Sequence, residues 1–324
     1  MNLNEETRLG YTISSKMKEI WSLQLQMTKF ILDICNKYNL RIWADGGTLL
    51  GAVRHHGYIP WDNDIDLLMP REDYDRLISL ADKEFKHPFF LQCAYTDKEY
   101  YRGHAQLRLD NTTAILSYDY FKKFHQGIFV DIFCYDSIPD ILDDNWNNKL
   151  KRADEIEHIL GFCNYTVSIF SNPKNILCRL RYLYYKYTNQ TMSLFREFEN
   201  LFRQCHWEDS HYFGCPAFDR LNAPKTTKEK EWYKETILLP FEDIEVPVPI
   251  GYDKVLRKQY GDNYMTPIHT TSMHGEEILF DTKKSYKEYL PLLRKKRNEE
   301  FKKKRIDTIN KIFKLKKFCY NGTL

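Results

Sequence analysis

Residues 43–74 contain glycines, a basic pair and carboxylates at spacings that fit phosphate chemistry. A glycine pair followed by a hydroxyl lets backbone amides approach a phosphate closely. The helix that we predict to begin at Thr48 would favour an anion at its N-terminus, and a guanidinium can hold a phosphate through two hydrogen bonds. The residues of this predicted phosphate site are Gly46, Gly47, Thr48, Arg54 and His55.

Carboxylates alternate along the next segment, at Asp62, Asp64 and Asp66. If this segment is a strand, the three side chains share one face, because successive side chains of a strand point to opposite faces. Aligned carboxylates repel one another, and a sheet normally avoids them. A divalent cation removes the repulsion, since Mg²⁺ prefers carboxylate oxygens together with substrate phosphates. The alternative is a solvated edge strand or an acidic turn.

A further carboxylate, Asp131, stands alone in the apolar run 127–133, which we predict to be a strand. Burial of an unpaired charge is unfavourable, so such a residue needs a partner or a metal ion. An aspartate paired with an arginine, or one that caps a loop, would satisfy the same pattern. The residues by themselves leave these interpretations open.

The run GGTLLGAVRHHGYIPWDNDIDLLMPREDY closely resembles the signature of the LicD family, which includes bacterial phosphocholine transferases and fukutin-related proteins. The resemblance covers roughly residues 25–265 and includes a second block in 230–265. Asn63 stands where the family often has Asp, so we do not expect it to be a required ligand. Cys134 replaces a frequent Pro after the Asp131 strand, a change expected to affect the following turn.

This resemblance implies a metal-dependent phosphotransferase. The family's fold places its third acidic residue on a later strand, which implies that Asp64, Asp66 and Asp131 hold Mg²⁺ or Mn²⁺ and form the catalytic set. The implied donor is CDP-choline or another CDP-alcohol, the acceptor is a hydroxyl of a glycan or a lipid-linked glycan, and the product is CMP. Asp131 is the candidate base. Trp61 and Arg108 complete the predicted substrate-binding set; Trp61 and Tyr58 could form a choline cage, or Trp61 could brace its loop.

Two other functions would use the same residues. A nucleotidyltransferase would move NMP from an NTP to a small acceptor and release pyrophosphate. A non-catalytic glycan- or lipid-binding protein would have kept the fold without the reaction. The long signature argues against the first, and the presence of all three carboxylates argues against the second.

The elements expected to position these residues form an α+β fold, with a nucleotidyltransferase-like mixed sheet flanked by helices. Apolar residues at helical spacing predict a helix over 16–39, and short apolar runs predict strands. The predicted strands are 40–43, 89–93, 106–109, 113–116 and 127–133. The predicted units are a catalytic core (1–140), a helical insert or acceptor-side subdomain (141–229), the C-terminal part of the catalytic domain (230–283) and a basic helical tail (284–324).

The insert is rich in aromatic residues, which could line an acceptor groove or form a core, the more common role of large aromatics. On one of its predicted helices the residues assigned to the packed face are Leu177, Leu180, Leu183 and Tyr184.

Composition bounds the remaining possibilities. The 324 residues are 43% hydrophobic and include no apolar run long enough to span a membrane. The N-terminus lacks the pattern of a signal peptide, so we expect a cytoplasmic protein. Its eight cysteines form no Cys-x-x-Cys pair and are expected to be free thiols.

The tail differs from the rest in charge. Segment 291–319 has twelve Lys/Arg and three Asp/Glu, a local charge of +9, whereas the whole chain is +3. Interleaved apolar residues make it an amphipathic basic helix that could lie on an anionic membrane at the inner face. A solvated terminal helix is the alternative. Nucleic acid is not an expected partner, since no recognition module accompanies the charge.

Overall fold

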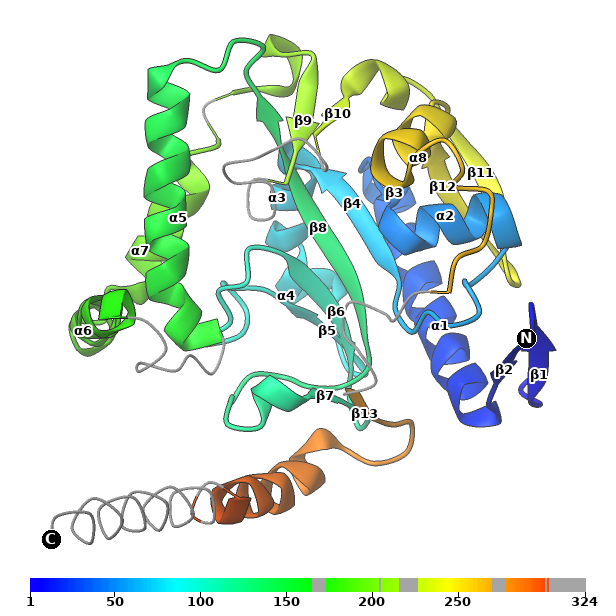
Figure 1. Cartoon of the computed structure of the whole chain (residues 1–324), viewed down its shortest axis with the longest axis horizontal. Helices are drawn as coiled ribbons and strands as arrows, with labels where there is room; N and C mark the ends of the chain where they lie inside the picture. The colour runs from blue at the N-terminus through cyan, green and yellow to red at the C-terminus, as the bar shows by residue number, and fades with distance from the viewer. Residues whose placement is uncertain (165–172, 204, 216–226, 270–277, 301, 303–324) are drawn as a thin grey trace, which may run out of the picture.

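The strand β8 (Phe129–Ile138) runs through the centre of the molecule and pairs with three other strands (Figure 1). It is parallel to β4 (Asp66–Pro70) and antiparallel to β6 (Ala105–Leu109) and β9 (Tyr212–Gly214). Nearly every residue of β8 is buried, which explains its apolar sequence. The computed structural model describes residues 1–164, 173–203, 205–215, 227–269, 278–300 and 302.

The other strands extend this sheet or form separate antiparallel pairs. In the sheet, β3 (Trp43–Ala44) pairs with β4, β5 (Phe89–Gln92) with β6, and β10 (Lys228–Glu229) with β9. The separate pairs are β1 (Glu6–Arg8) with β2 (Tyr11–Ile13), β7 (Thr113–Leu116) with β13 (Ile278–Asp281), and β11 (Thr236–Phe241) with β12 (Ile244–Pro249). One parallel pair within an otherwise antiparallel sheet makes it mixed.

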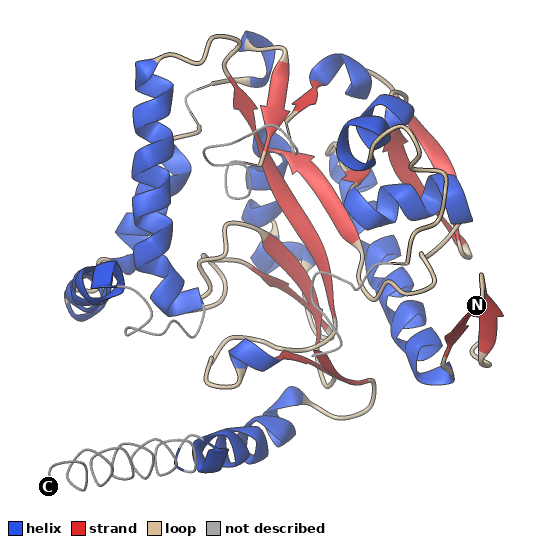
Figure 2. Cartoon of the chain, viewed as in Figure 1, coloured by secondary structure: helices blue, strands red, loops and turns tan. Residues whose placement is uncertain are grey.

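Helices lie against this sheet, as Figure 2 shows. The helix predicted over 16–39 is α1 (Ser15–Tyr38). It begins where the hydroxyl of Ser14 accepts the amide of Met17 at 3.2 Å, and it ends at Asn39 in the left-handed conformation. The other helices of this part are α2 (Gly46–His55), α3 (Arg71–Ser79), α4 (Ala81–Glu84) and α8 (Tyr252–Tyr260), with 3₁₀ turns at Ser117–Asp119, Trp207–Asp209 and Lys230–Tyr233. The α+β prediction is confirmed.

The strand predicted from Asp62 onward begins only at Asp66. The preceding backbone is bonded elsewhere: the indole of Trp21 donates to the Asp62 carbonyl at 3.1 Å, and the Gln24 amide donates to the Asn63 carbonyl at 2.9 Å. Because α1 takes up these carbonyls, residues 62–65 form an irregular segment on the way into β4. The expected alternation over the whole acidic run was therefore wrong before Asp66.

Three helices form a second body beside the sheet: α5 (Asp144–Asn164), α6 (Pro173–Tyr187) and α7 (Thr191–Asn200). They enclose a hydrophobic core of their own, separate from the main core. On α6, however, the prediction of the packed face was wrong for Leu177, Leu180 and Tyr184, which are exposed. The division of the chain at residues 140, 229 and 283 stays a prediction.

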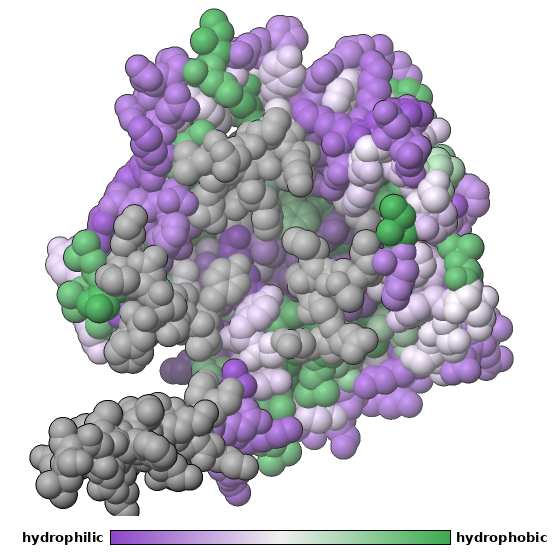
Figure 3. Space-filling view, in the orientation of Figure 1, coloured by the Kyte–Doolittle hydropathy of each residue, from purple (hydrophilic) through white to green (hydrophobic). Residues whose placement is uncertain are grey.

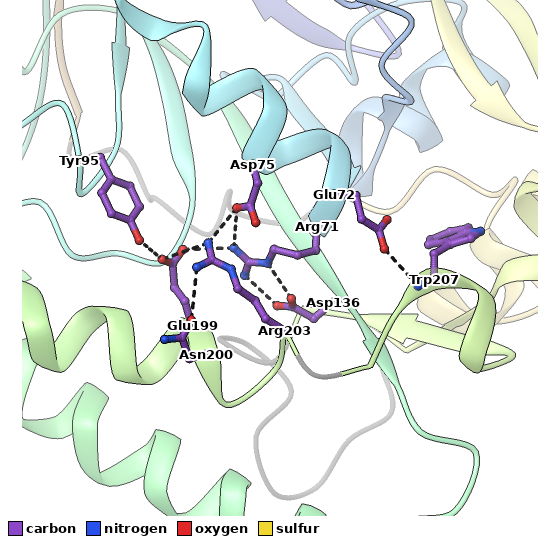
Figure 4. A network of polar contacts seen from close by, with 9 residues as sticks. All are labelled: Arg71, Glu72, Asp75, Tyr95, Asp136, Glu199, Asn200, Arg203 and Trp207. Atoms are coloured by element: carbon purple, nitrogen blue, oxygen red, sulfur yellow. Dashed lines mark hydrogen bonds and ion pairs between the residues drawn. The ribbon is translucent and has the colours of Figure 1, made fainter.

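A buried ionic network joins this helical body to the sheet (Figure 4). Arg71 of α3 donates to both carboxylate oxygens of Asp136 on β8, at 2.7 and 2.9 Å, and to Glu199 of α7 at 3.1 Å. Arg203 continues the network to Glu199 and to Asp75 on α3. The network fixes α7 against the sheet.

The C-terminal region is helical over 286–300. Most of the predicted basic tail, 291–319, lies outside the described residues. Among the residues that the structure describes, no helix is long and apolar enough to cross a membrane, and the seven described cysteines are free thiols, as predicted.

Candidate active site

The pairing of β4 with β8 brings two of the predicted carboxylates together. Asp66 lies directly opposite Asp131 in the parallel register, and Asp64 joins them from the segment before β4. One oxygen of each of the three carboxylates lies within 4.8 Å of the others. Burial, followed by the charges of Asp64 and Asp131, raises the pKa of Asp66 well above its ordinary value. Such a group of hard oxygen ligands fits Mg²⁺ or Mn²⁺.

The Asp131 side chain is held in place by side chains from β6 and from the residue directly before it. The amide of Gln106 donates to the Asp131 carboxylate at 2.6 Å, and the Nε2 atom of His104 lies 3.3 Å from the same oxygen. Arg108 donates to Gln106, to Gln92 and to the Gly127 carbonyl. The Arg108 side chain is fully buried in these contacts. This position supports orientation of Asp131 through Gln106, and the predicted contact of Arg108 with substrate stays untested.

The glycine turn holds the backbone of Asp66. The Asp45 amide donates to the Asp66 carbonyl at 3.0 Å, and the Asp66 amide donates to the Thr48 hydroxyl at 2.8 Å. Thr48 is thereby engaged with Asp66. Gly46 has a φ of +51°, and a Cβ atom there would lie 3.0 Å from the Asp66 carboxylate. At Gly47 a Cβ atom would lie 2.5 Å from a carboxylate oxygen of Asp62, so the turn packs against the acidic residues too closely for a side chain.

Comparison with known proteins relates the part of the chain that carries these residues to a family. A sequence model described as LicD/FKTN/FKRP, nucleotidyltransferase domain, matches residues 39–160, which include the glycine turn and all three carboxylates. The lipopolysaccharide cholinephosphotransferase LicD of Haemophilus influenzae is 27% identical over 250 residues, covering 75% of this chain and 89% of that protein. Residues 39–160 therefore form a nucleotidyltransferase domain of the LicD family.

Other relatives share shorter parts. An uncharacterized protein of Rickettsia prowazekii is 31% identical over 141 residues, 43% of this chain and 48% of the relative. The human ribitol 5-phosphate transferase FKRP is 40% identical over 48 residues, 15% of this chain and 10% of that protein.

A buried polar group behind the glycine turn of this LicD-family site was not predicted. Asp45 accepts hydrogen bonds from Lys228 and from the Tyr135 hydroxyl, the latter at 2.6 Å. The Lys228 ammonium also lies 4.8 Å from the centre of the Tyr135 ring. Lys228 comes from β10, far away in the sequence, so no local pattern could have identified it. The aspartate directly before the glycine pair was the only available signal.

The predicted basic pair lies at the opposite end of α2 from the glycines. Arg54 donates to the neutral ring of His55 at 2.8 Å and to the Tyr264 carbonyl at 2.7 Å. Burial, together with the charge of Arg54, lowers the pKa of His55 to about 4. At ~1.5 Å rise per residue, Arg54 lies about 12 Å along the helix from Gly46. Arg54 and the glycine turn therefore start from opposite ends of α2, and contact of either with a ligand stays a prediction.

The aromatic residues predicted for a choline cage pack against different neighbours. Tyr58 is buried and stacked on Trp21 with ring centres 4.3 Å apart, so it is not available to a ligand. Trp61 is partly buried and makes edge contacts with Tyr11 and His269. Its packing is consistent with the bracing role, and its contact with substrate stays a prediction.

Proposed function

We propose that this enzyme transfers a phosphocholine or phospho-polyol group from a CDP-linked donor to a hydroxyl of a cell-surface glycan or its lipid-linked precursor. The acceptor oxygen forms a bond to the phosphorus that carries the choline or polyol. The bond from that phosphorus to the CMP oxygen breaks, and CMP leaves. The LicD-family domain makes the chain a phosphotransferase, and relatives named for cholinephosphate and ribitol phosphate transfer support this choice of group.

The observation that carries the proposal is the register that sets Asp66 opposite Asp131, with Asp64 beside them. These residues would hold Mg²⁺ or Mn²⁺, which when bound supplies positive charge to the entering and leaving oxygens. Asp131 remains the candidate acceptor of the hydroxyl proton. Gln106 and His104 orient its carboxylate.

The chain's other residues would bind and orient the donor. The N-terminus of α2 attracts anions through its amides, but Asp62 and Asp66 lie against its glycines. A phosphate there would therefore lie beside two carboxylates, which supports a cation shared between them. Arg54 at the far end of α2 would contact a different part of the donor, and most of the catalysis would come from positioning and charge neutralisation.

Product analysis tests the proposal. The protein is incubated with Mg²⁺ and, separately, with CDP-choline, CDP-glycerol, CDP-ribitol and NTPs, each with and without a glycan acceptor. We expect CMP from one CDP-alcohol. The Asp66→Asn variant should release none, and the matched control Asp33→Asn, at an exposed position on α1, should behave like the original protein. Pyrophosphate from an NTP would replace the proposal by nucleotidyl transfer, and no product from any donor would support a binding protein.

A further inference from the structure

The helix α6 has an exposed apolar face in addition to the one that it packs. Its five most exposed apolar residues are between 52% and 80% exposed. At 3.6 residues per turn they fall within an arc of about 100° on one side of the helix. They are Ile176, Leu177, Leu180, Tyr184 and Tyr187. We call this surface the α6 stripe.

The stripe is not needed to hold α6 in place. On the opposite side of the helix, Tyr182 is buried in the core of the helical body, and Cys178 and Tyr185 pack against that core. In Figure 1, α6 lies at the outer edge of the molecule, away from the sheet, and Figure 3 shows hydrophobic surface at the same edge. The stripe therefore faces outward from a helix whose inward side is already packed.

Basic residues border the stripe on both sides. Helix α6 contains no Asp or Glu. Arg181 lies on one border and Arg179 and Lys186 on the other, each about 90–130° from the centre of the stripe by helical geometry. Arg181 and Lys186 are paired with Glu155 and Glu99 of neighbouring segments, and their side chains are still partly exposed.

An apolar face bordered by cations, with tyrosines among its residues, has the chemistry of a helix that lies in a membrane interface. The apolar side chains can enter the boundary between headgroups and acyl chains, while long basic side chains reach back to lipid phosphates. A second copy of this chain fits less well, because stripe-to-stripe pairing would bring Arg and Lys of the two copies together.

From these observations we propose that the α6 stripe docks the protein on the surface of a bilayer that contains anionic lipids. This inference goes beyond the proposed function and does not depend on it. It also concerns a different surface from the predicted basic tail, 291–319. Attraction of that tail would be electrostatic and weakened by salt, whereas insertion of the stripe buries apolar area and should persist at high salt.

Flotation of the full-length protein with vesicles tests the proposal. The vesicles are phosphatidylcholine with or without phosphatidylglycerol, at low and high salt. We expect binding to the mixed vesicles, with a high-salt component that falls at least tenfold in Leu177→Glu/Leu180→Glu. The matched control is Leu238→Glu on β11, since Leu238 is 57% exposed and Leu180 is 59% exposed; it should bind like the original protein.

Depth and oligomeric state complete the test. A tryptophan placed by Tyr184→Trp should be quenched by brominated acyl chains, and one placed by Leu238→Trp should not. Absence of binding to mixed vesicles would overturn the proposal, as would equal high-salt binding by the double-glutamate variant. A dimer in sedimentation velocity that this variant dissolves, without any vesicle binding, would assign the stripe to a second copy instead.

Discussion

Strand β8 carries two buried aspartates with opposite surroundings. Asp131 is 3% exposed and lies next to the carboxylates of Asp64 and Asp66. Asp136, further along the same strand, is 2% exposed and accepts two hydrogen bonds from the Arg71 guanidinium. Their odd spacing sends them to opposite faces of the sheet. Asp131 lies beside Asp66, which contacts the glycine turn, whereas Asp136 faces Arg71, which also contacts Glu199 of α7 (Figure 4).

The different surroundings of the two carboxylates give Asp136 a structural role and make Asp131 a candidate for a functional one. The charge of Asp136 is balanced inside the protein by a guanidinium with two parallel hydrogen bonds. Around Asp131 the nearest charges have the same sign, a grouping that favours binding of a cation from solution. An arginine partner was the predicted alternative for Asp131, and that description fits Asp136 instead.

Removal of one carboxylate from the cluster around Asp131 should abolish the proposed activity. Asp66→Asn keeps the size of the side chain but removes an anionic ligand, so we expect CMP release to fall by about 10⁴-fold or more, ~5 kcal/mol in the barrier. Calorimetry should show weaker Mn²⁺ binding, while the free energy of unfolding in EDTA should not fall, because repulsion is relieved. Mn²⁺ binding equal to that of the original protein would contradict the assignment.

Removal of Arg71, the partner of Asp136, should instead destabilise the fold. Arg71→Met leaves Asp136 and Glu199 without their shared guanidinium, and loss of one partner of a buried pair typically costs about 3–5 kcal/mol. Denaturant unfolding measures this loss. The double variant Arg71→Met/Asp136→Leu should recover part of it, because the uncompensated carboxylate is also removed. A single variant as stable as the original protein would show that the network is not structural.

A smaller effect is expected at Arg54. If the Arg54 guanidinium binds a phosphate of the CDP-linked substrate through two N–H groups at once, Arg54→Lys should lower kcat/KM by roughly tenfold, ~1.4 kcal/mol. Lysine offers only a point charge in place of the two directed hydrogen bonds. Arg257→Lys, at an exposed arginine of α8, is the matched control. Full activity of Arg54→Lys would exclude this contact and leave Arg54 as a support for the backbone at Tyr264.

The smallest expected effect is on the pH dependence of stability and comes from the buried, uncharged side chain of His125. Burial lowers the pKa of His125 to about 4, and its neutral ring accepts from the Gly127 amide and donates to Asp110. Between the unfolded pKa, ~6.5, and the folded one, only the unfolded chain gains the proton, so stability should fall as pH decreases. From pH 6.5 to pH 5.5 we expect the free energy of unfolding to fall by about 1 kcal/mol less in His125→Asn than in the original protein. An identical pH dependence in both proteins would exclude this contribution.

Local patterns gave the candidates, and the family resemblance chose among them. A lone carboxylate in an apolar strand drew attention to Asp131, and alternation drew attention to Asp62, Asp64 and Asp66. The resemblance to the LicD family then implied that Asp64, Asp66 and Asp131 act together, and the structure brings these three into one cluster. Reasoning from local patterns failed where distant groups compete for the backbone: α1 takes the carbonyls before Asp66, so the strand starts late. Tyr58 likewise stacks on Trp21 of α1, a contact that no local spacing predicts.

Contacts across the sheet were beyond sequence reasoning. Gln106 reaches the site from β6, His104 from the residue directly before β6, and Lys228 from β10. Their positions depend on strand order and register. Helical periodicity identified α6, but its residues are apolar over much of the circumference. Spacing alone therefore could not decide which side would pack and which would face outward.

The register of β4 against β8 also has a consequence for folding. Asp66 and Asp131 belong to strands that are distant along the chain, so their cluster cannot form before this long-range pairing does. A slip by one residue would set Val130 or Ile132 opposite Asp66 and send the carboxylates to opposite faces. A divalent ion bound by the cluster would stabilise only chains with the native alignment, through mass action. The residues proposed for chemistry would thereby also select the correct strand pairing as the protein folds.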